Sequence, residues 1–410
     1  MSSVRSEAPI ELRRARPDDL DGIADLLAAR GEPADAVDLR LVAADPDEGL
    51  DHVFVATAGE RVVATATLLR ETVRLGGVDL PAGQVELVAT DPEFEGRGLI
   101  RSLMAMAHER SHARGDLLQV MIGIPYFYRQ FGYVYSMPIP LTRSLRADAD
   151  IGPDAGADGV TVREAGVADI PAMHALQERT QSAVEVSMPH SPGCWRWLVA
   201  RDGSSQWVAE ADGRVVATAR ALPPEEGMVL GEVAGDPTGV RALLRHARGL
   251  SDSVDVMDRD GTPEGALLEP LLTPEDDPDA ARHWYYLRVA RVAPLLEALR
   301  PVLGRRWLEA GGDGRDPAEV LVSSYRSHVR FRLDGDGMGP VAAGGALQAP
   351  VSNGGSGVPP DVIGPLLFGP HGAAGLERRH ADVLLGRQRE LMTALFPPVR
   401  ADLLTFYLPI

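Results

Sequence analysis

The hydrophobic positions near the start of the chain predict a short strand followed by an amphipathic helix. Residues 12–15 have the character of the strand, and apolar residues then recur at every third position from 20 to 26, which marks one helix face. The same arrangement returns 150 residues later, where residues 162–165 precede apolar positions at the same spacing over 170–176. We infer that these segments are two copies of one unit.

Two further stretches repeat in the same order. The letters RVVATA occupy residues 61–66 and again 214–219, each time after a strand and a glycine-containing turn, which is typical of a β-hairpin. The stretch VATDP at 88–92 is matched by VAGDP at 233–237. Because three matches in one order are difficult to obtain by chance, we infer that the first two-thirds of the chain is a tandem duplication.

The last third of the chain has a different pattern, in which strand-like and helical segments alternate. We therefore predict an α/β (α+β) fold, with two tandem mixed sheets flanked by helices and a third α+β domain after them. Linkers rich in Asp, Gly and Pro are expected at 147–159 and 272–281. The predicted domains are residues 8–146, 160–284 and 285–410, the last with strands near 283–289, 320–325 and 328–333 and helices near 292–303, 360–367 and 383–395.

Composition narrows the classes of protein that this chain can be. Its 410 residues are 45% hydrophobic and 24% charged, enough to bury cores in about two to four domains. The net charge of −18, from 41 Lys+Arg against 59 Asp+Glu, argues against nucleic-acid binding, which depends on cationic contacts to phosphate. The same charge either serves solubility or attracts a polycationic substrate.

The sequence lacks the features expected of a membrane protein or of a disulfide-bonded secreted protein. The first residues do not form the apolar stretch of a signal peptide, and no run approaches 18 apolar residues. Cys194 is the one cysteine, which excludes an intramolecular disulfide. The histidines show no metal-ligand spacing. We expect a cytoplasmic protein without a metal site and without a membrane partner.

The most informative stretch is a predicted strand, loop and helix over residues 85–104. The helix part has apolar residues over 99–106, and the loop before it contains Gly96 and Gly98. The first N–H groups of a helix have no intrahelical partner and lie at its positive end, which suits a pyrophosphate. Glycine lets that backbone approach the phosphates closely. In the second copy a five-residue deletion removes the loop, so we expect one copy to bind the ligand and the other to serve as scaffold.

The combination of strand, Val-x-x-x-Pro, Gly-x-Gly loop and helix resembles the acetyl-CoA motif of GNAT acetyltransferases. The whole arrangement is similar to the Eis-type family, which has a GNAT domain, a degenerate GNAT domain and a C-terminal domain similar to sterol carrier proteins. The resemblance is strongest over residues 85–135. The family pattern has Gln or Arg where Glu95 stands here, and a carboxylate beside a pyrophosphate would repel it unless the side chain turns outward.

The resemblance implies an N-acetyltransferase that binds acetyl-CoA and a primary amine, without a metal. Backbone groups on the strand would pair with the pantetheine arm, the glycine loop would hold the pyrophosphate, and the next strand, predicted over 118–124, would line the thioester. The residues that it assigns are Val88, Ala89 and Thr90 for the arm, Gly96, Arg97, Gly98, Leu99, Ile100 and Arg101 for the pyrophosphate, and Gly123 and Ile124 for the thioester.

Two catalytic groups also follow from the resemblance. In the family motif Tyr-x-x-Phe-Gly-Tyr the first tyrosine, here Tyr128, gives a proton to the departing CoA thiolate. The base in Eis-like enzymes is the terminal carboxylate, which here belongs to Ile410. The tail around it is apolar, which indicates a docked end, and burial would raise the pKa of the carboxylate. The alternatives are tyrosines that pack around a turn and a tail that is docked for stability alone.

The substrate class and other functions stay open at this level. The family suggests aminoglycosides or lysine side chains as acceptors, bound by variable loops such as 30–51, and it suggests a homo-oligomer such as a hexamer. A non-catalytic acyl-CoA sensor is one alternative, with Glu95 as the hint. A carrier of apolar ligands, acting through residues 285–410, is another.

Overall fold

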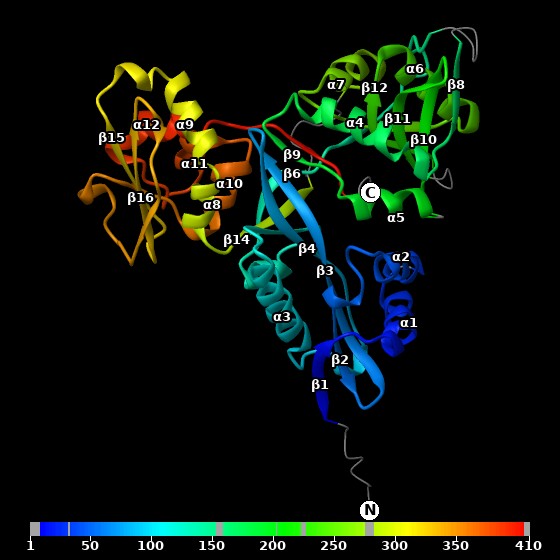
Figure 1. Ribbon diagram of the computed structural model, residues 1–410, viewed down its shortest axis with the longest axis horizontal. Helices are drawn as coiled ribbons and strands as arrows, with labels where there is room; N and C mark the ends of the chain where they lie inside the picture. The colour runs from blue at the N-terminus through cyan, green and yellow to red at the C-terminus, as the bar shows by residue number, and fades with distance from the viewer. Residues whose placement is uncertain are drawn as a thin grey trace, which may run out of the picture.

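The computed structural model describes residues 9–31, 33–152, 159–201, 203–222, 227–274 and 283–405. In Figure 1 the chain forms three bodies, coloured blue to cyan, green, and yellow to red. Each body contains a sheet with helices packed against it, so the predicted mixed α/β class is confirmed. Among the described residues no helix has both the length and the apolar character needed to cross a membrane.

The first body is built on a mixed sheet. Its path runs β1-β2-β3-β4-β5-β14-β6, and β9 and β20 join at the far end of β3. Pairing is antiparallel except between β4 and β5 and between β9 and β20. The strands are β1 (Ile10–Arg14), β2 (Val53–Ala58), β3 (Arg61–Leu75), β4 (Val78–Thr90), β5 (Leu118–Met121), β6 (Val134–Pro138), β9 (Val186–Met188), β14 (Trp284–Val289) and β20 (Ala401–Leu403).

The long hairpin of β3 and β4 is the central element of this body. Leu75 and Val78 pair across a two-residue turn in which Gly76 and Gly77 have φ angles of +56° and +85°. Both central residues of such a turn need positive φ, which glycine adopts without a Cβ clash. The tip of the hairpin rests on the third body, where the Arg305 guanidinium donates a hydrogen bond to the Gly76 carbonyl at 2.8 Å.

Helices cover both faces of the hairpin (Figure 1). On one face α3 buries Leu103 and Met104, and on the other α1 buries Ile23 and Leu27. The two residues named on α1 are four positions apart and those on α3 are adjacent, spacings that place each pair on one side of its helix. The helices of this body are α1 (Leu20–Arg30), α2 (Pro33–Ala44) and α3 (Leu99–Arg114).

The second body repeats the plan of the first. Its sheet runs β8-β10-β11-β12-β13-β7, and α4 and α6 correspond to α1 and α3. α6 begins directly after β12, with the Asp236 carboxylate accepting from the Gly239 N–H at 2.8 Å as an N-cap, so the glycine loop is absent here. The elements are β7 (Thr142–Ser144), β8 (Val160–Glu164), β10 (Ser205–Ala211), β11 (Arg214–Leu222), β12 (Met228–Gly235), β13 (Val254–Met257), α4 (Ile170–Gln181), α5 (Pro192–Ala200), α6 (Pro237–Leu250) and α7 (Pro263–Leu268).

The first two bodies each receive a strand from a distant part of the chain. β7, which follows the first body in sequence, pairs antiparallel with β13 of the second. β14, which follows the second body, lies between β5 and β6 of the first. The strand predicted near 283–289 is therefore present, and it completes the first sheet. The first sheet contains β14, so a structural domain built on this sheet includes that strand. The predicted domain boundaries remain predictions.

The third body has a smaller sheet with the path β17-β16-β15-β19, and β18 pairs with β16. Its core is continuous with the first body, because Leu75 and Leu80 of the hairpin pack in one cluster with Val320 and Phe331. The helix predicted at 292–303 is divided in two at Leu299, just before a proline. The elements are α8 (Val292–Ala298), α9 (Arg300–Glu309), β15 (Ala318–Ser323), β16 (His328–Asp334), β17 (Gly337–Met338), β18 (Ala342–Gly344), β19 (Ser356–Gly357), α10 (Ile363–Phe368), α11 (Gly372–Arg379) and α12 (Arg389–Leu395).

Candidate active site

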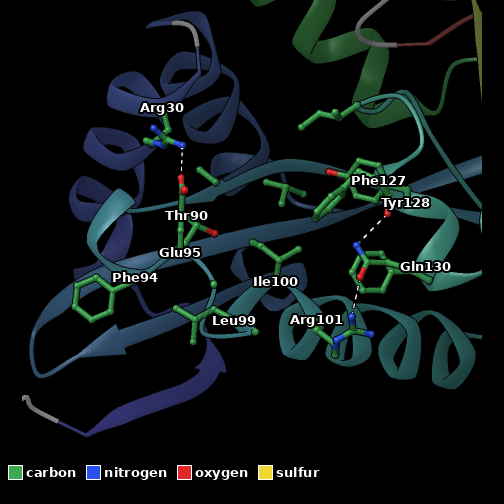
Figure 2. Close-up of a pocket in the computed structure, with 16 residues that line it drawn as sticks. Arg30, Thr90, Phe94, Glu95, Leu99, Ile100, Arg101, Phe127, Tyr128 and Gln130 are labelled. Carbon is green, nitrogen blue, oxygen red and sulfur yellow. Dashed lines mark hydrogen bonds and ion pairs between the residues drawn. The ribbon is translucent and has the colours of Figure 1, made fainter.

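A cavity opens in the first body where β4 and β5 cease to pair. The two strands are hydrogen-bonded only from Ala82 to Gln84 on β4, opposite Leu118 to Val120 on β5. Beyond this fork lies a cavity of about 550 Å³, shown in Figure 2. It is lined by Arg30, Val88, Ala89, Thr90, Phe94, Glu95, Gly96, Gly98, Leu99, Ile100, Arg101, Ile124, Phe127, Tyr128, Gln130 and Phe131.

A bulge in β4 shapes the wall of this cavity. Leu87 has a φ of +51°, and the pairing with β3 shifts register between Thr65 and Thr67. A bulge of this kind leaves an extra residue without a partner and redirects the strand. The Thr90 hydroxyl, which lines the cavity, is buried and has no hydrogen-bond partner among the described residues. A buried hydroxyl without a hydrogen-bond partner destabilises the fold unless a ligand bonds to it, so this wall fits a polar chain such as pantetheine.

The glycine loop forms another part of the cavity lining. Gly96 and Gly98 have φ angles of +73° and +77°, and α3 begins at Leu99 without a side-chain cap. The first N–H groups of α3 are therefore available to an anion, as the sequence predicts. Arg101 lines the same region, and its guanidinium donates to the Gln130 side chain at 2.7 Å. The arrangement fits a pyrophosphate.

Glu95 is neutralised by a partner that the sequence did not reveal. Its carboxylate accepts a hydrogen bond from the guanidinium of Arg30, the last residue of α1, at 2.6 Å (Figure 2). Arg30 and Glu95 both line the cavity, and their side chains are 39% and 54% exposed. The repulsion expected between Glu95 and a pyrophosphate is thus offset by an equal positive charge nearby.

Tyr128 lies at the inner end of the cavity, in a 3₁₀ turn over Phe127–Phe131. Its ring lies close against Gly123, where a Cβ would be only 2.5 Å from the nearest ring atom. Burial is the main cause that raises the pKa of Tyr128 above its ordinary value. The charges of Glu86 and Tyr286 raise this pKa further. The phenol therefore keeps its proton throughout the neutral pH range and can donate it to an anion formed beside it.

The turn that carries Tyr128 is fixed by the strand from the distant part of the chain. Tyr126, just before the turn, has a φ of +70°, which is strained for a tyrosine. Its N–H donates a hydrogen bond to the hydroxyl of Tyr286 on β14 at 2.8 Å. Sequence reasoning missed Tyr286 because nothing in the local pattern around residue 286 indicates that β14 pairs with β5.

Glu86, at the fork, is a second residue that sequence reasoning missed. Its carboxylate accepts hydrogen bonds from the Gln84 side chain, at 2.6 Å, and from the backbone N–H of Ile122. Burial raises its pKa to about 8, against the lowering effect of these two donors, and the charge of Asp35 raises it slightly more. The available signal was a carboxylate within the apolar run VELVAT, a position where strands rarely carry an acid.

Most of the predicted cofactor residues meet around one cavity, and two do not line it. Arg97 lies outside, with its guanidinium 4.6 Å from the Phe94 ring. Gly123 lies behind the Tyr128 ring rather than on the cavity surface. The strand expected over 118–124 ends at Met121, because its pairing with β4 stops at Val120, and Ile124 is exposed at its continuation.

The predicted base, Ile410, lies outside the described residues, which end at Thr405. β20 runs beside β9, where Figure 1 shows the red end of the chain reaching the green second body. Asp402 forms a buried bidentate ion pair with Arg259 at 2.6 and 2.9 Å. The Thr405 carbonyl accepts from Arg220 at 3.0 Å. The Thr405 side chain is also hydrogen-bonded to Tyr285, whose hydroxyl donates to the side chain of Gln84 at 2.6 Å.

The described residues contain no cluster of three or more His, Cys, Asp or Glu side chains arranged to hold a metal ion. Cys194, weighed from sequence as a core or contact residue, is buried with Trp197 and Leu198 against Leu69 of the first body. It therefore belongs to the contact between the first two bodies.

Comparison with known families identifies the first body. Residues 11–136 match the model of the acetyltransferase (GNAT) domain. The chain thus carries a GNAT acetyltransferase domain, a class whose members transfer acyl groups and use acetyl-CoA and amine substrates. A search of curated proteins gave no match.

Solved structures extend the likeness to nearly the whole chain. A GCN5-related N-acetyltransferase from Kribbella flavida is 17% identical, with a TM-score of 0.70 over 97% of this chain and 100% of that one. A GCN5-related N-acetyltransferase from Anabaena variabilis is 14% identical, with a TM-score of 0.68 over 95% and 97%. Eis1 from Mycobacterium abscessus is 18% identical, with a TM-score of 0.63 over 96% and 99%. At these identities the likeness shows a shared fold.

Proposed function

We propose that the protein transfers the acetyl group of acetyl-CoA directly to a primary amine. The observation that carries this proposal is one cavity that joins the glycine loop of a GNAT domain to a buried tyrosine. Direct transfer needs the amine and the thioester to be held together, and it needs no covalent enzyme intermediate. An aminoglycoside or a lysine side chain is the class of acceptor that we propose.

Acetyl-CoA would lie along β4 and the start of α3. Backbone groups of Val88, Ala89 and Thr90 would bind the pantetheine arm, and the unpaired Thr90 hydroxyl supports this placement. The N–H groups of the loop from Gly96 to Arg101 would bind the pyrophosphate, which the positive φ angles of the two glycines support. The thioester would then reach the surface formed by Gly123 and Ile124, next to Tyr128.

Tyr128 would act as the general acid. When the amine displaces CoA, the sulfur leaves as a thiolate and takes up a proton. The raised pKa of Tyr128 keeps its phenol protonated until an anion forms beside it. The carboxylate of Ile410 would act as the base that removes a proton from the nitrogen during the attack. The hydrogen bond between Thr405, five residues before Ile410, and Tyr285 near the fork supports this role.

The same resemblance extends the proposal to the rest of the chain. We propose that residues 285–410 form a sterol-carrier-like domain and that the chain assembles as a homo-oligomer, with a hexamer as the expected form, in the cytoplasm. Light scattering coupled to size exclusion tests the assembly, and a single species of monomer mass would contradict it.

The function is tested by CoA release from acetyl-CoA with a panel of primary amines. We expect amine-dependent turnover in the wild type, and its loss in Tyr128→Phe and in a chain that ends at Thr405. Tyr126→Phe is the matched control, because the Tyr126 side chain is 76% exposed and only its backbone N–H bonds to Tyr286. Turnover that survives the truncation contradicts the role of Ile410. Binding of acetyl-CoA without turnover for any amine would favour the sensor.

A further inference from the structure

A second cavity, which we call the junction cavity, lies where the first and third bodies meet. Its volume is about 680 Å³, larger than the cofactor cavity. One wall is formed by β6, by β14 and by the turn that carries Tyr128, and the other by α10, α11 and the loops next to them. Gly364 of α10 lies against Ser136 of β6, and Figure 1 shows α10 and α11 in orange beside this edge of the first sheet. Among the described residues only Phe131 lines both cavities.

The lining of the junction cavity carries an excess of positive charge. Arg129, Arg288 and Arg379 line it, and Asp361 is the one acidic residue among the described lining residues. Three arginines against one aspartate leave a net charge of +2, with the two lining histidines counted as neutral. The whole chain has a net charge of −18, so this concentration of cations runs against its composition. A concave surface of this sign attracts an anion.

None of the three arginines has a carboxylate partner among the described residues. Arg288 donates to the Phe131 carbonyl at 3.0 Å and to the side-chain oxygen of Gln119 at 2.6 Å, and both acceptors are neutral. The Arg129 guanidinium lies 5.5 Å from the centre of the Tyr135 ring. A guanidinium has five N–H groups, so these contacts leave several of them available to a ligand.

Partial burial makes these cations costly without an anion. Burial is the main cause that lowers the pKa of Arg288, against a smaller raising effect of Tyr133. Burial also lowers the pKa of His371, and the charges of Arg379 and His380 lower it further. Cations that are removed from water need opposite charges nearby, and this cluster has too few carboxylates to supply them. An anion in the cavity would provide the missing charge.

The rest of the lining suits an apolar part of the same ligand. Trp284 of β14 lines the cavity with its side chain only partly buried, and Leu376 and three prolines add apolar surface on the opposite wall. A planar group can stack on an indole ring or on the face of a guanidinium. The cavity therefore combines cations for a charged group with a surface for a ring.

We propose that the junction cavity binds a small organic anion. Its phosphate or carboxylate groups are held by Arg129, Arg288 and Arg379, and its apolar part packs against Trp284. Arginine suits both kinds of group, because its planar fork donates two parallel hydrogen bonds to them. The described lining includes neither Tyr128 nor the glycine loop, so this site is separate from the proposed places of acetyl-CoA and of the acceptor.

Isothermal titration with phenyl phosphate tests the proposal, with acetyl-CoA present at a concentration that fills the first cavity. Phenyl phosphate has both an anionic group and a ring, and we expect one site with a Kd of about 0.1–1 mM, as is usual for so small a ligand. Inorganic phosphate, which has no ring, should bind more weakly. Phthalate has carboxylates on a ring, so its affinity relative to phenyl phosphate shows whether the site prefers a carboxylate or a phosphate.

Arg129→Met and Arg379→Met test the two walls of the cavity separately. Both side chains are exposed, so the variants should fold, which an unchanged thermal unfolding midpoint would show. Each should weaken phenyl phosphate binding about fivefold to tenfold, because a charge-assisted hydrogen bond is lost. Asp361→Asn should act in the opposite direction and tighten binding about threefold, because it removes a repulsive charge from the lining.

Arg332→Met is the matched control, because Arg332 is an exposed arginine of the third body that does not line the junction cavity. Its affinity for phenyl phosphate should equal that of the wild type. The proposal is overturned if the wild type binds none of the three anions up to about 10 mM, or if Arg129→Met and Arg379→Met bind them as the wild type does. These titrations need no turnover, so failure of the proposed acetyl transfer would leave their outcome unchanged.

Discussion

The ion pair between Arg30 and Glu95 makes a quantitative prediction about acetyl-CoA binding. The two side chains lie 2.6 Å apart at the edge of the cavity, so the pair presents almost no net charge to the pyrophosphate. Arg30→Ala leaves a negative charge there, and Glu95→Gln leaves a positive one. We expect the first to weaken acetyl-CoA binding, the second to tighten it, and the double variant to bind like the wild type.

The size of the effect follows from the exposure of the pair. At 39% and 54% exposure the charges are well screened, so a dielectric constant of about 80 is appropriate. At about 8 Å a unit charge then interacts with each phosphate charge by about 0.5 kcal/mol. The two charges of a pyrophosphate give about 1 kcal/mol, or about a fivefold change in Kd in opposite directions for the two single variants.

Isothermal titration of acetyl-CoA at about 0.05 M and about 0.5 M salt measures these changes. Both should shrink at the higher ionic strength, because the Debye length falls well below the separation. Arg40→Ala is a suitable control, since Arg40 forms a similar exposed pair with Asp21, and neither residue lines the cavity. Changes of the same sign in both single variants, or changes that persist at high salt, would refute the electrostatic argument.

Three other predictions concern the loop and the core. Gly98→Ala should weaken acetyl-CoA binding about fivefold in a titration. The φ angle of residue 98 is +77°, and alanine in this left-handed region costs about 1 kcal/mol, although its Cβ would meet nothing within 4 Å. Unchanged affinity would contradict the role of the loop. Burial raises the pKa of Glu48 from 4.5 to about 7, so the folded state binds more protons than the unfolded state between these values. Wild-type stability should therefore fall from pH 4.5 to 7 relative to Glu48→Gln, by up to about 3 kcal/mol in denaturant unfolding, and parallel curves would refute this. Arg259→Met leaves Asp402 buried without its guanidinium and should lower stability by about 3–5 kcal/mol, with partial recovery in the double variant with Asp402→Asn.

The local parts of the site could be predicted from sequence because neighbouring residues decide them. Gly96 and Gly98 adopt positive φ, and α3 begins directly after them, as the pattern of glycines and apolar residues indicates. The deletion in the second copy likewise predicts the direct start of α6 at Pro237. The repeat predicts two similar sheets, since a shared pattern of apolar positions buries similar faces.

The register between distant segments could not be predicted, because periodicity shows which face of a strand is buried and not which strand lies beside it. Residues 283–289 have the pattern of a strand, but the choice of β5 and β6 as its neighbours depends on how the bodies pack. That choice brings Tyr286 to the turn of Tyr128 and Tyr285 to Gln84. The importance of Glu86 depends on it too, because only the end of pairing at Gln84 places this carboxylate at a fork.

The sequence by itself determined the chemistry that is available: a glycine loop before a helix, a tyrosine in a turn, and a chain in which acidic residues outnumber basic ones. The tertiary structure alone decided which of these groups meet. Arg30 reaches Glu95 across 65 residues, and Arg220 reaches Thr405 across 185. Such contacts have no local signal, because burial and sheet pairing fix them only after the whole chain has folded.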